Sequence, residues 1–144
     1  MLYRFQITLH ARPPGELATE ATLLDGRECQ RLIVPHEQIA TPFAVSFEEA
    51  YAAMEALPRM FIEPDGSFVW VSSQGESPRW QLDGALYDRS GRLLYVDLKG
   101  ECPPEAWDKL LGCVGAPPQA VMAQLVRQAV FLGEDDFRRF ASTA

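Results

Sequence analysis

Asparagine is absent from this chain of 144 residues, lysine occurs only as Lys99 and Lys109, and cysteine occurs three times. No C-x-x-C pair is present, and no pair of histidines lies near Cys29, Cys102 or Cys113. A zinc site therefore has no support, and an odd cysteine count is typical of reduced, buried thiols. We accordingly expect neither a bound metal nor a cofactor.

Motifs for catalysis and nucleotide binding are missing as well. The chain contains no G-x-G-x-x-G, no G-K-[ST] and no G-x-S-x-G. It thus lacks the loops that hold a phosphate or present a serine nucleophile. We interpret His10 and His36 as surface histidines rather than catalytic bases. No catalytic residue is predicted, and a non-enzymatic role is favoured over an enzyme.

Long hydrophobic runs and clusters of basic residues are also absent from the sequence. No stretch approaches the roughly 18 apolar residues of a membrane-spanning helix, and the first eleven residues alternate instead of forming a signal-peptide core. We therefore expect a cytoplasmic protein that does not bind membranes. The net charge is −7 and the arginines are scattered, which disfavours nucleic acid and anionic lipid as partners.

Hydrophobic residues make up 47% of the chain, which is enough for a core without disulfide or metal support. The length predicts a single globular domain over residues 1–144. The expected order of elements is strands, one helix, four strands and then helices, which predicts an α+β fold built on a single antiparallel sheet.

The amino-terminal third begins with a strand and then becomes ambiguous. Residues 2–10 alternate between apolar and polar side chains, which predicts a half-buried strand. In residues 16–34, Asp25-Gly26 is a two-residue hairpin turn that would lead into a strand through Leu32. A short helix over residues 16–24 is the alternative, and the hairpin is favoured.

Helix signals flank the middle of the chain. A capping box from Ser46 to Glu49 predicts a helix that Pro58 ends. Beyond the expected strands, Pro103 opens a helix, Pro117 opens a second with an apolar face, and a short helix follows Gly133. We therefore expect one helix before the central strands and two to three helices after them.

The clearest pattern is a hairpin repeated at an offset of 25 residues, from 61–71 to 86–96. Each copy has an acid, a turn glycine and a following apolar run, so we expect three-residue loops at Pro64-Asp65-Gly66 and Arg89-Ser90-Gly91. The two copies predict a four-stranded antiparallel meander over about residues 59–99.

A three-residue loop in the second hairpin would set Asp83 directly opposite Asp97. Two carboxylates about 5 Å apart repel by about 3 kcal/mol at an effective dielectric constant of 20. The core face is then expected to carry Trp80, Leu82, Leu86, Leu94, Val96 and Leu98, extended by Phe61, Val69 and Val71. The second face is expected to carry Met60, Ile62, Phe68, Trp70, Gln81, Tyr87, Leu93, Tyr95 and Lys99 beside the acid pair.

This second face mixes large aromatic side chains with acids, and three interpretations remain open. Part of it could be buried under the amino-terminal strands, it could bind a partner or a second copy, or it could form a ligand or catalytic cleft. The residues expected at a ligand or partner surface are Trp70, Asp83, Tyr87, Tyr95 and Asp97. The favoured function is a small acidic interaction domain that binds a protein partner or self-associates. The alternative is a small enzyme, or a metal- or ligand-binding protein, that uses the Asp83/Asp97 pair.

Overall fold

The structure, a computed structural model, describes residues 1–142. They form one antiparallel sheet of nine strands with three α-helices, which confirms an α+β fold with a single antiparallel sheet. In chain order the elements are β1 (Tyr3–Ala11), β2 (Ala18–Leu24), β3 (Arg27–Ile33), η1 (His36–Gln38), α1 (Phe47–Glu55), β4 (Met60–Ile62), β5 (Ser67–Val71), β6 (Gln81–Arg89), β7 (Arg92–Cys102), α2 (Pro104–Cys113), η2 (Pro118–Ala120), β8 (Val121–Leu125), β9 (Val130–Gly133) and α3 (Glu134–Ala141). Across the sheet the strands run in the order β2-β3-β9-β8-β1-β7-β6-β5-β4.

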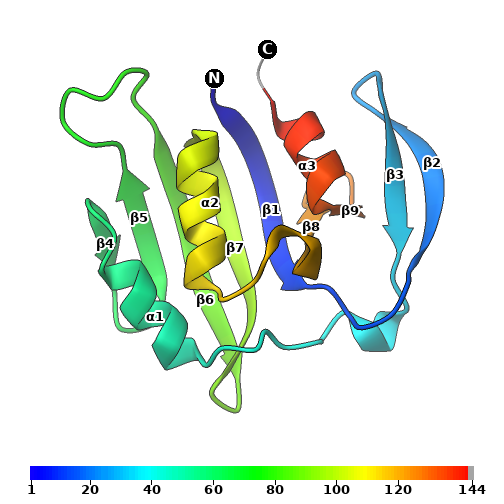
Figure 1. Cartoon of the computed structure of the whole chain (residues 1–144), viewed down its shortest axis with the longest axis horizontal. Helices are drawn as coiled ribbons and strands as arrows, with labels where there is room; N and C mark the ends of the chain where they lie inside the picture. The colour runs from blue at the N-terminus through cyan, green and yellow to red at the C-terminus, as the bar shows by residue number, and fades with distance from the viewer. Residues whose placement is uncertain (143–144) are drawn as a thin grey trace.

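All three α-helices lie on the same side of the sheet (Figure 1). The core between them and the sheet is continuous. Phe5 of β1 packs edge-on against Trp107 of α2 and Phe137 of α3, with ring centroids 5.6 and 5.2 Å apart. We call this side of the sheet the helix-covered face. The opposite side, which carries Gln6, Thr8 and their neighbours in adjacent strands, is the helix-free face.

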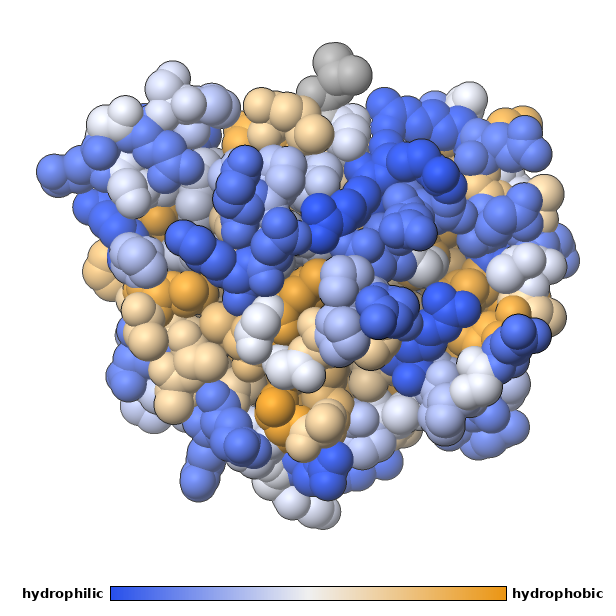
Figure 2. All heavy atoms as spheres, in the orientation of Figure 1, coloured by the Kyte–Doolittle hydropathy of each residue, from blue (hydrophilic) through white to orange (hydrophobic). Residues whose placement is uncertain are grey.

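Figure 2 views the molecule from the helix side. Hydrophilic atoms gather over α3 and β3, whereas hydrophobic surface is more frequent toward α1. Within residues 1–142, no helix is long and apolar enough to cross a membrane.

Two local predictions from turn and cap chemistry are confirmed. The Ser46 hydroxyl accepts a hydrogen bond from the Glu49 amide at 3.0 Å, and the Glu49 carboxylate accepts one from the Ser46 amide at 2.9 Å. Residues 18–33 form the favoured hairpin, in which Asp25 and Gly26 adopt positive φ angles of 49° and 78°. Both residue types tolerate that conformation, which a two-residue hairpin turn requires.

The predicted helix after Pro117 is wrong. That segment forms the turn η2 and the hairpin β8–β9, and β8 pairs with β1 on its other side. Four of the five β8 residues are buried, and both faces of the strand are covered. A strand buried on both faces has a continuous apolar sequence, which periodicity cannot distinguish from a buried helix.

The predicted register of the β6–β7 hairpin is also wrong. Its loop has two residues, Ser90 and Gly91, both with positive φ, and a bulge follows at Tyr87/Asp88. Together they shift the pairing by two residues, so Asp83 lies opposite Lys99 rather than Asp97. The first hairpin has the expected three-residue loop, because Glu63 N donates to Ser67 O at 2.8 Å.

The two faces of the β4–β5 hairpin are reversed relative to the prediction. Phe68 and Trp70 are buried on the helix-covered face together with Met60 and Ile62, while Phe61, Val69 and Val71 lie on the other face. Leu93 is likewise buried, and Leu94, expected in the core, is only half-buried beside the bulge. The pairing between β5 and β6 decides which face of the sheet each β5 side chain occupies. The length of the loop between the two strands does not reveal that pairing.

Candidate functional site

The helix-free face brings together four of the five residues expected at a ligand or partner surface. Tyr87 pairs directly with Tyr95, and Asp83 and Asp97 share the same face further along β6 and β7. Trp70 does not belong to this surface. It is 3% exposed, lies edge-on to Trp80, and its Nε1 donates to Pro58 O at 3.0 Å.

Four aromatic side chains form a row across the helix-free face. The rings of Tyr87 and Tyr95 stack with centroids 4.6 Å apart and an interplanar angle of 13°. Tyr95 in turn stacks on His10, and Phe131 of β9 meets the imidazole edge-on, with centroid distances of 5.6 and 5.4 Å. Stacking holds the exposed Tyr87 ring in one orientation, because each neighbour is supported by the next.

His10 is not the surface histidine expected from its place on the polar side of β1. Only 6% of it is exposed, and Nε2 lies 2.7 Å from the Thr8 hydroxyl, which donates to Gln124 at 3.3 Å. Burial lowers the pKa of His10 to about 4, and the nearby Ile39 backbone offsets this only in part. Within residues 1–142, the buried Nδ1 atom has no hydrogen-bond partner. The imidazole is therefore neutral at physiological pH and supports the row structurally.

The carboxylates near the aromatic row affect the exposed tyrosine. The negative charge of Asp97 and its hydrogen bond raise the pKa of Tyr87, and Asp65 adds a smaller contribution. Asp83 and Asp97 are diagonal rather than direct neighbours, a relation that typically separates positions by about 7–8 Å. Their mutual repulsion is therefore weaker than a direct pair would give, and Lys99 lies across from Asp83.

A shallow hollow of about 480 Å³ lies beside the row. It is lined by Gln6, Ile7, Thr8, Asp83, Gly84, Ala85, Asp97, Leu98, Lys99 and Val126. The small side chain of Ala85 opposite Asp97 helps keep the hollow open. Amide, hydroxyl, carboxylate and ammonium groups therefore line it beside the small side chain of Ala85 and the exposed Val126.

An apolar patch extends the surface toward the edge of the sheet. Phe61 and Val69 are cross-strand partners, and they are 61% and 37% exposed, while Tyr87 is 40% exposed. Sequence reasoning placed Phe61 and Val69 in the core and missed them here. They would have been found only if the buried face of the β4–β5 hairpin had been predicted correctly.

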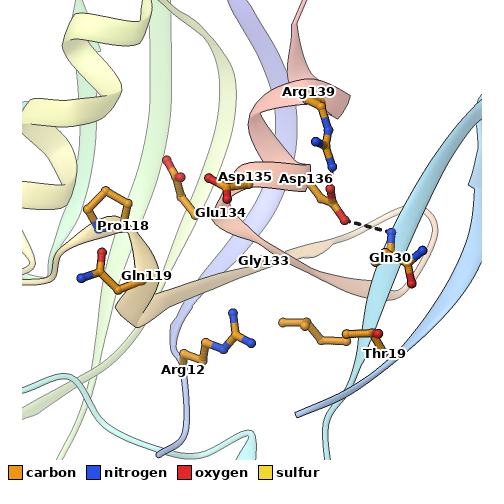
Figure 3. Close-up of a pocket in the computed structure, with 11 residues that line it drawn as sticks. Arg12, Thr19, Gln30, Pro118, Gln119, Gly133, Glu134, Asp135, Asp136 and Arg139 are labelled. Atoms are coloured by element: carbon orange, nitrogen blue, oxygen red, sulfur yellow. Dashed lines mark hydrogen bonds and ion pairs between the residues drawn. The ribbon is translucent and has the colours of Figure 1, made fainter. Parts of the chain in front are cut away.

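A second hollow, of about 490 Å³, lies between α3, the β2–β3 hairpin and η2 (Figure 3). Its lining is Arg12, Thr19, Gln30, Leu32, Pro118, Gln119, Gly133, Glu134, Asp135, Asp136 and Arg139. We call it the α3 cleft. No pattern in the sequence indicates that the acidic residues after Gly133 share a hollow with Arg12.

Groups for metal or thiol chemistry do not assemble in the described part of the chain. Residues 1–142 contain no cluster of three or more histidine, cysteine, aspartate or glutamate side chains suited to a metal ion. Cys29, Cys102 and Cys113 are buried free thiols. Burial raises the pKa of Cys102 to about 12, so this thiol stays protonated and unreactive at neutral pH.

Comparison with known proteins assigns no family. The chain matches no family model, and no curated protein or solved structure matches it at a significant level. The two hollows and the exposed apolar residues of the helix-free face are therefore the features that indicate a function.

Proposed function

We propose that this protein is an interaction domain that binds a positively charged protein partner through the helix-free face. The observation that carries the proposal is a face with exposed apolar and aromatic side chains next to acids: Val69 pairs with Phe61 on one side and Asp83 on the other, and the exposed Tyr87 lies diagonally from Asp97. Aromatic side chains with a polar rim are the composition that protein interfaces favour.

Charge favours a basic partner. Asp65 and Asp97 lie close enough to Tyr87 to raise its pKa, and Asp83 lies opposite Lys99 further along the same two strands. The whole chain carries a net charge of −7. A negative field of this kind speeds encounter with a cationic surface and repels acidic ones.

The stacked tyrosines supply the chemistry for a specific contact. A lysine or arginine of the partner could lie over the exposed ring of Tyr87 and pair with the Asp97 carboxylate. The ring quadrupole attracts a cation, and the carboxylate supplies charge-assisted hydrogen bonds. Because Tyr95 and His10 already hold the tyrosine ring, little side-chain entropy is lost on binding.

Self-association through this face is the less favoured form of interaction. Two copies would bring equal negative charges together, and like charges across an interface oppose binding. The alternative of an enzyme that uses the Asp83/Asp97 pair has less support, since the two residues do not face each other directly.

The proposal is tested by affinity capture with wild-type protein and matched variants. Tyr87→Ala and Asp97→Asn should each weaken retention of a basic partner by about tenfold or more, and higher salt should weaken it further. Glu55→Gln, which changes an exposed acid on α1, should retain the partner like wild type. Light scattering on the same proteins reports the oligomeric state.

Two outcomes would overturn the proposal. One is a captured protein that is acidic, or that Tyr87→Ala and Asp97→Asn retain as well as wild type does. The other is a wild-type dimer that Tyr87→Ala converts to a monomer, because the face would then serve self-association.

A further inference from the structure

The α3 cleft is enclosed by four separate parts of the chain. Arg12 follows β1, Thr19 and Gln30 come from the outer hairpin, Gln119 comes from η2, and Asp135 comes from α3 (Figure 3). Its volume of about 490 Å³ is within the range of small-molecule sites, which is roughly 300–1,000 Å³. It shares no lining residue with the proposed partner surface.

Most of the charged groups at the cleft are already paired. Asp136 is buried, accepts a hydrogen bond from the Gln30 amide at 2.9 Å, and forms an ion pair with Arg139. Glu134 is also buried and accepts hydrogen bonds from Trp107 Nε1 and Arg138. These two carboxylates hold α3 against β3 and α2, so they are not available to a ligand.

One cation and one anion remain. Among residues 1–142, neither Arg12 nor Asp135 takes part in an ion pair or a side-chain hydrogen bond, although both line the cleft. The Arg12 guanidinium lies against the start of α3, since a Cβ atom built on Gly133 would be 3.5 Å from its Nη1. Opposite charges that face one hollow without pairing leave both charges for a ligand.

The walls of the cleft are held in place independently of those two groups. Arg27 of the outer hairpin donates to the carbonyl oxygens of Arg139 and Phe140 near the end of α3. The Arg12 amide donates to Ala120 O at 2.8 Å, which fixes the position of Arg12 beside η2. A site framed in this way needs little reorganisation on binding.

We propose that the α3 cleft binds a small zwitterion of the free α-amino acid class. The ligand carboxylate pairs with the guanidinium of Arg12, and its ammonium group pairs with Asp135. The side chains of Thr19, Gln30 and Gln119 provide hydroxyl and amide groups for polar parts of the ligand. A phosphate ester fits poorly, because three carboxylates line the same hollow.

The test is isothermal titration of the whole chain with a panel of free L-amino acids. At least one should bind, and Arg12→Gln and Asp135→Asn should each weaken its binding by about tenfold or more. Analogues with only one charge, an N-acetyl amino acid and an amino acid amide, should lose affinity to a similar extent. Arg127→Gln and Glu48→Gln, which alter exposed charges outside the cleft, are the matched controls and should bind like wild type.

The proposal is overturned if no amino acid in the panel binds. It is equally overturned if a binding amino acid retains its affinity in Arg12→Gln and Asp135→Asn, or if the N-acetyl or amide analogue binds as well as the parent. Far-ultraviolet circular dichroism of both variants checks that they remain folded. None of these outcomes depends on the helix-free face, so the proposed partner can fail while the zwitterion site stands.

Discussion

On β1, Phe5 lies between aromatic rings of α2 and α3, while its neighbour Gln6 lines a shallow hollow on the other side of the sheet. The two faces of one strand thus have different tasks. The helix-covered face excludes water through one continuous apolar core. The helix-free face combines stacked rings, carboxylates and exposed apolar groups, which contribute less to folding and remain available for binding.

The helix-free face is ordered although no α-helix of the described residues lies over it. Its central residue, His10, is buried between Tyr95 and Phe131 and hydrogen-bonded to Thr8. The aromatic row therefore has a small packed base of its own beneath an exposed end at Tyr87. A rigid base with an exposed tip is an arrangement that suits recognition.

The sharpest test compares two phenylalanines of the same hairpin. Phe68→Ala, on the helix-covered face, should lower the free energy of unfolding by about 3–5 kcal/mol because it leaves a cavity. Phe61→Ala, on the helix-free face, should change it by only about 0.5 kcal/mol. Urea denaturation measures both. Equal losses would show that the faces are not distinct in this hairpin.

The next effect is a pH dependence centred on His10. Its pKa is about 4 in the folded chain against an ordinary histidine value of 6.5, so the unfolded chain binds more protons between these values. Stability should be complete above pH 6.5 and fall by up to about 3 kcal/mol as the pH drops to 4. Denaturation midpoints across this range measure the loss. His10→Gln should remove most of the slope, and an unchanged slope would contradict the assignment.

Close packing within the sheet gives a smaller effect. A Cβ atom on Gly84 would lie 2.5 Å from the Phe68 ring and 2.4 Å from Asp97 O, so Gly84→Ala should cost about 1–3 kcal/mol. The control is Gly112→Ala in α2, where a Cβ atom meets nothing within 4 Å. That change should stabilise the protein by about 0.5–1 kcal/mol. Thermal denaturation compares them, and a neutral Gly84→Ala would refute the close approach.

The smallest effect is electrostatic and concerns only the helix-free face. Since the Asp97 carboxylate raises the pKa of Tyr87, Asp97→Asn should lower that pKa toward 10.0, the ordinary tyrosine value. Ultraviolet absorbance of the ionised phenol, with Tyr87→Phe identifying the signal, measures the shift. If the tyrosine titration is unchanged in Asp97→Asn, the Asp97 carboxylate does not act on Tyr87. The proposed contact of a partner's cation with both groups would then lose support.

Several features were predictable because they depend on a few consecutive residues. The alternation of β1, the capping box at Ser46 and the turn at Asp25-Gly26 all rest on local chemistry. Register was not predictable in the same way. The β6–β7 hairpin has a two-residue loop and a bulge at Tyr87/Asp88 instead of the expected three-residue loop. Very similar turn residues can close either kind of hairpin, so the sequence does not distinguish the two registers.

The candidate surface was predictable only in part for the same reason. Asp83, Tyr87, Tyr95 and Asp97 share a face because they occupy alternate positions of two adjacent strands. Phe61 and Trp70 were assigned to the wrong faces because nothing in residues 72–80 reveals the phase between β5 and β6. The α3 cleft brings Arg12 and Asp135 to one hollow from segments too distant in sequence for any pattern to connect them.

The sequence by itself determined the α+β class, the turn at Asp25-Gly26, the first helix and the negative charge, because these follow from local conformational preferences and composition. The tertiary structure alone decided that residues 121–133 contain two strands, that His10 is buried, and which side chains remain on the helix-free face. The physical reason is that strand pairing joins distant segments. Each pairing can shift by one residue and move every side chain to the other face.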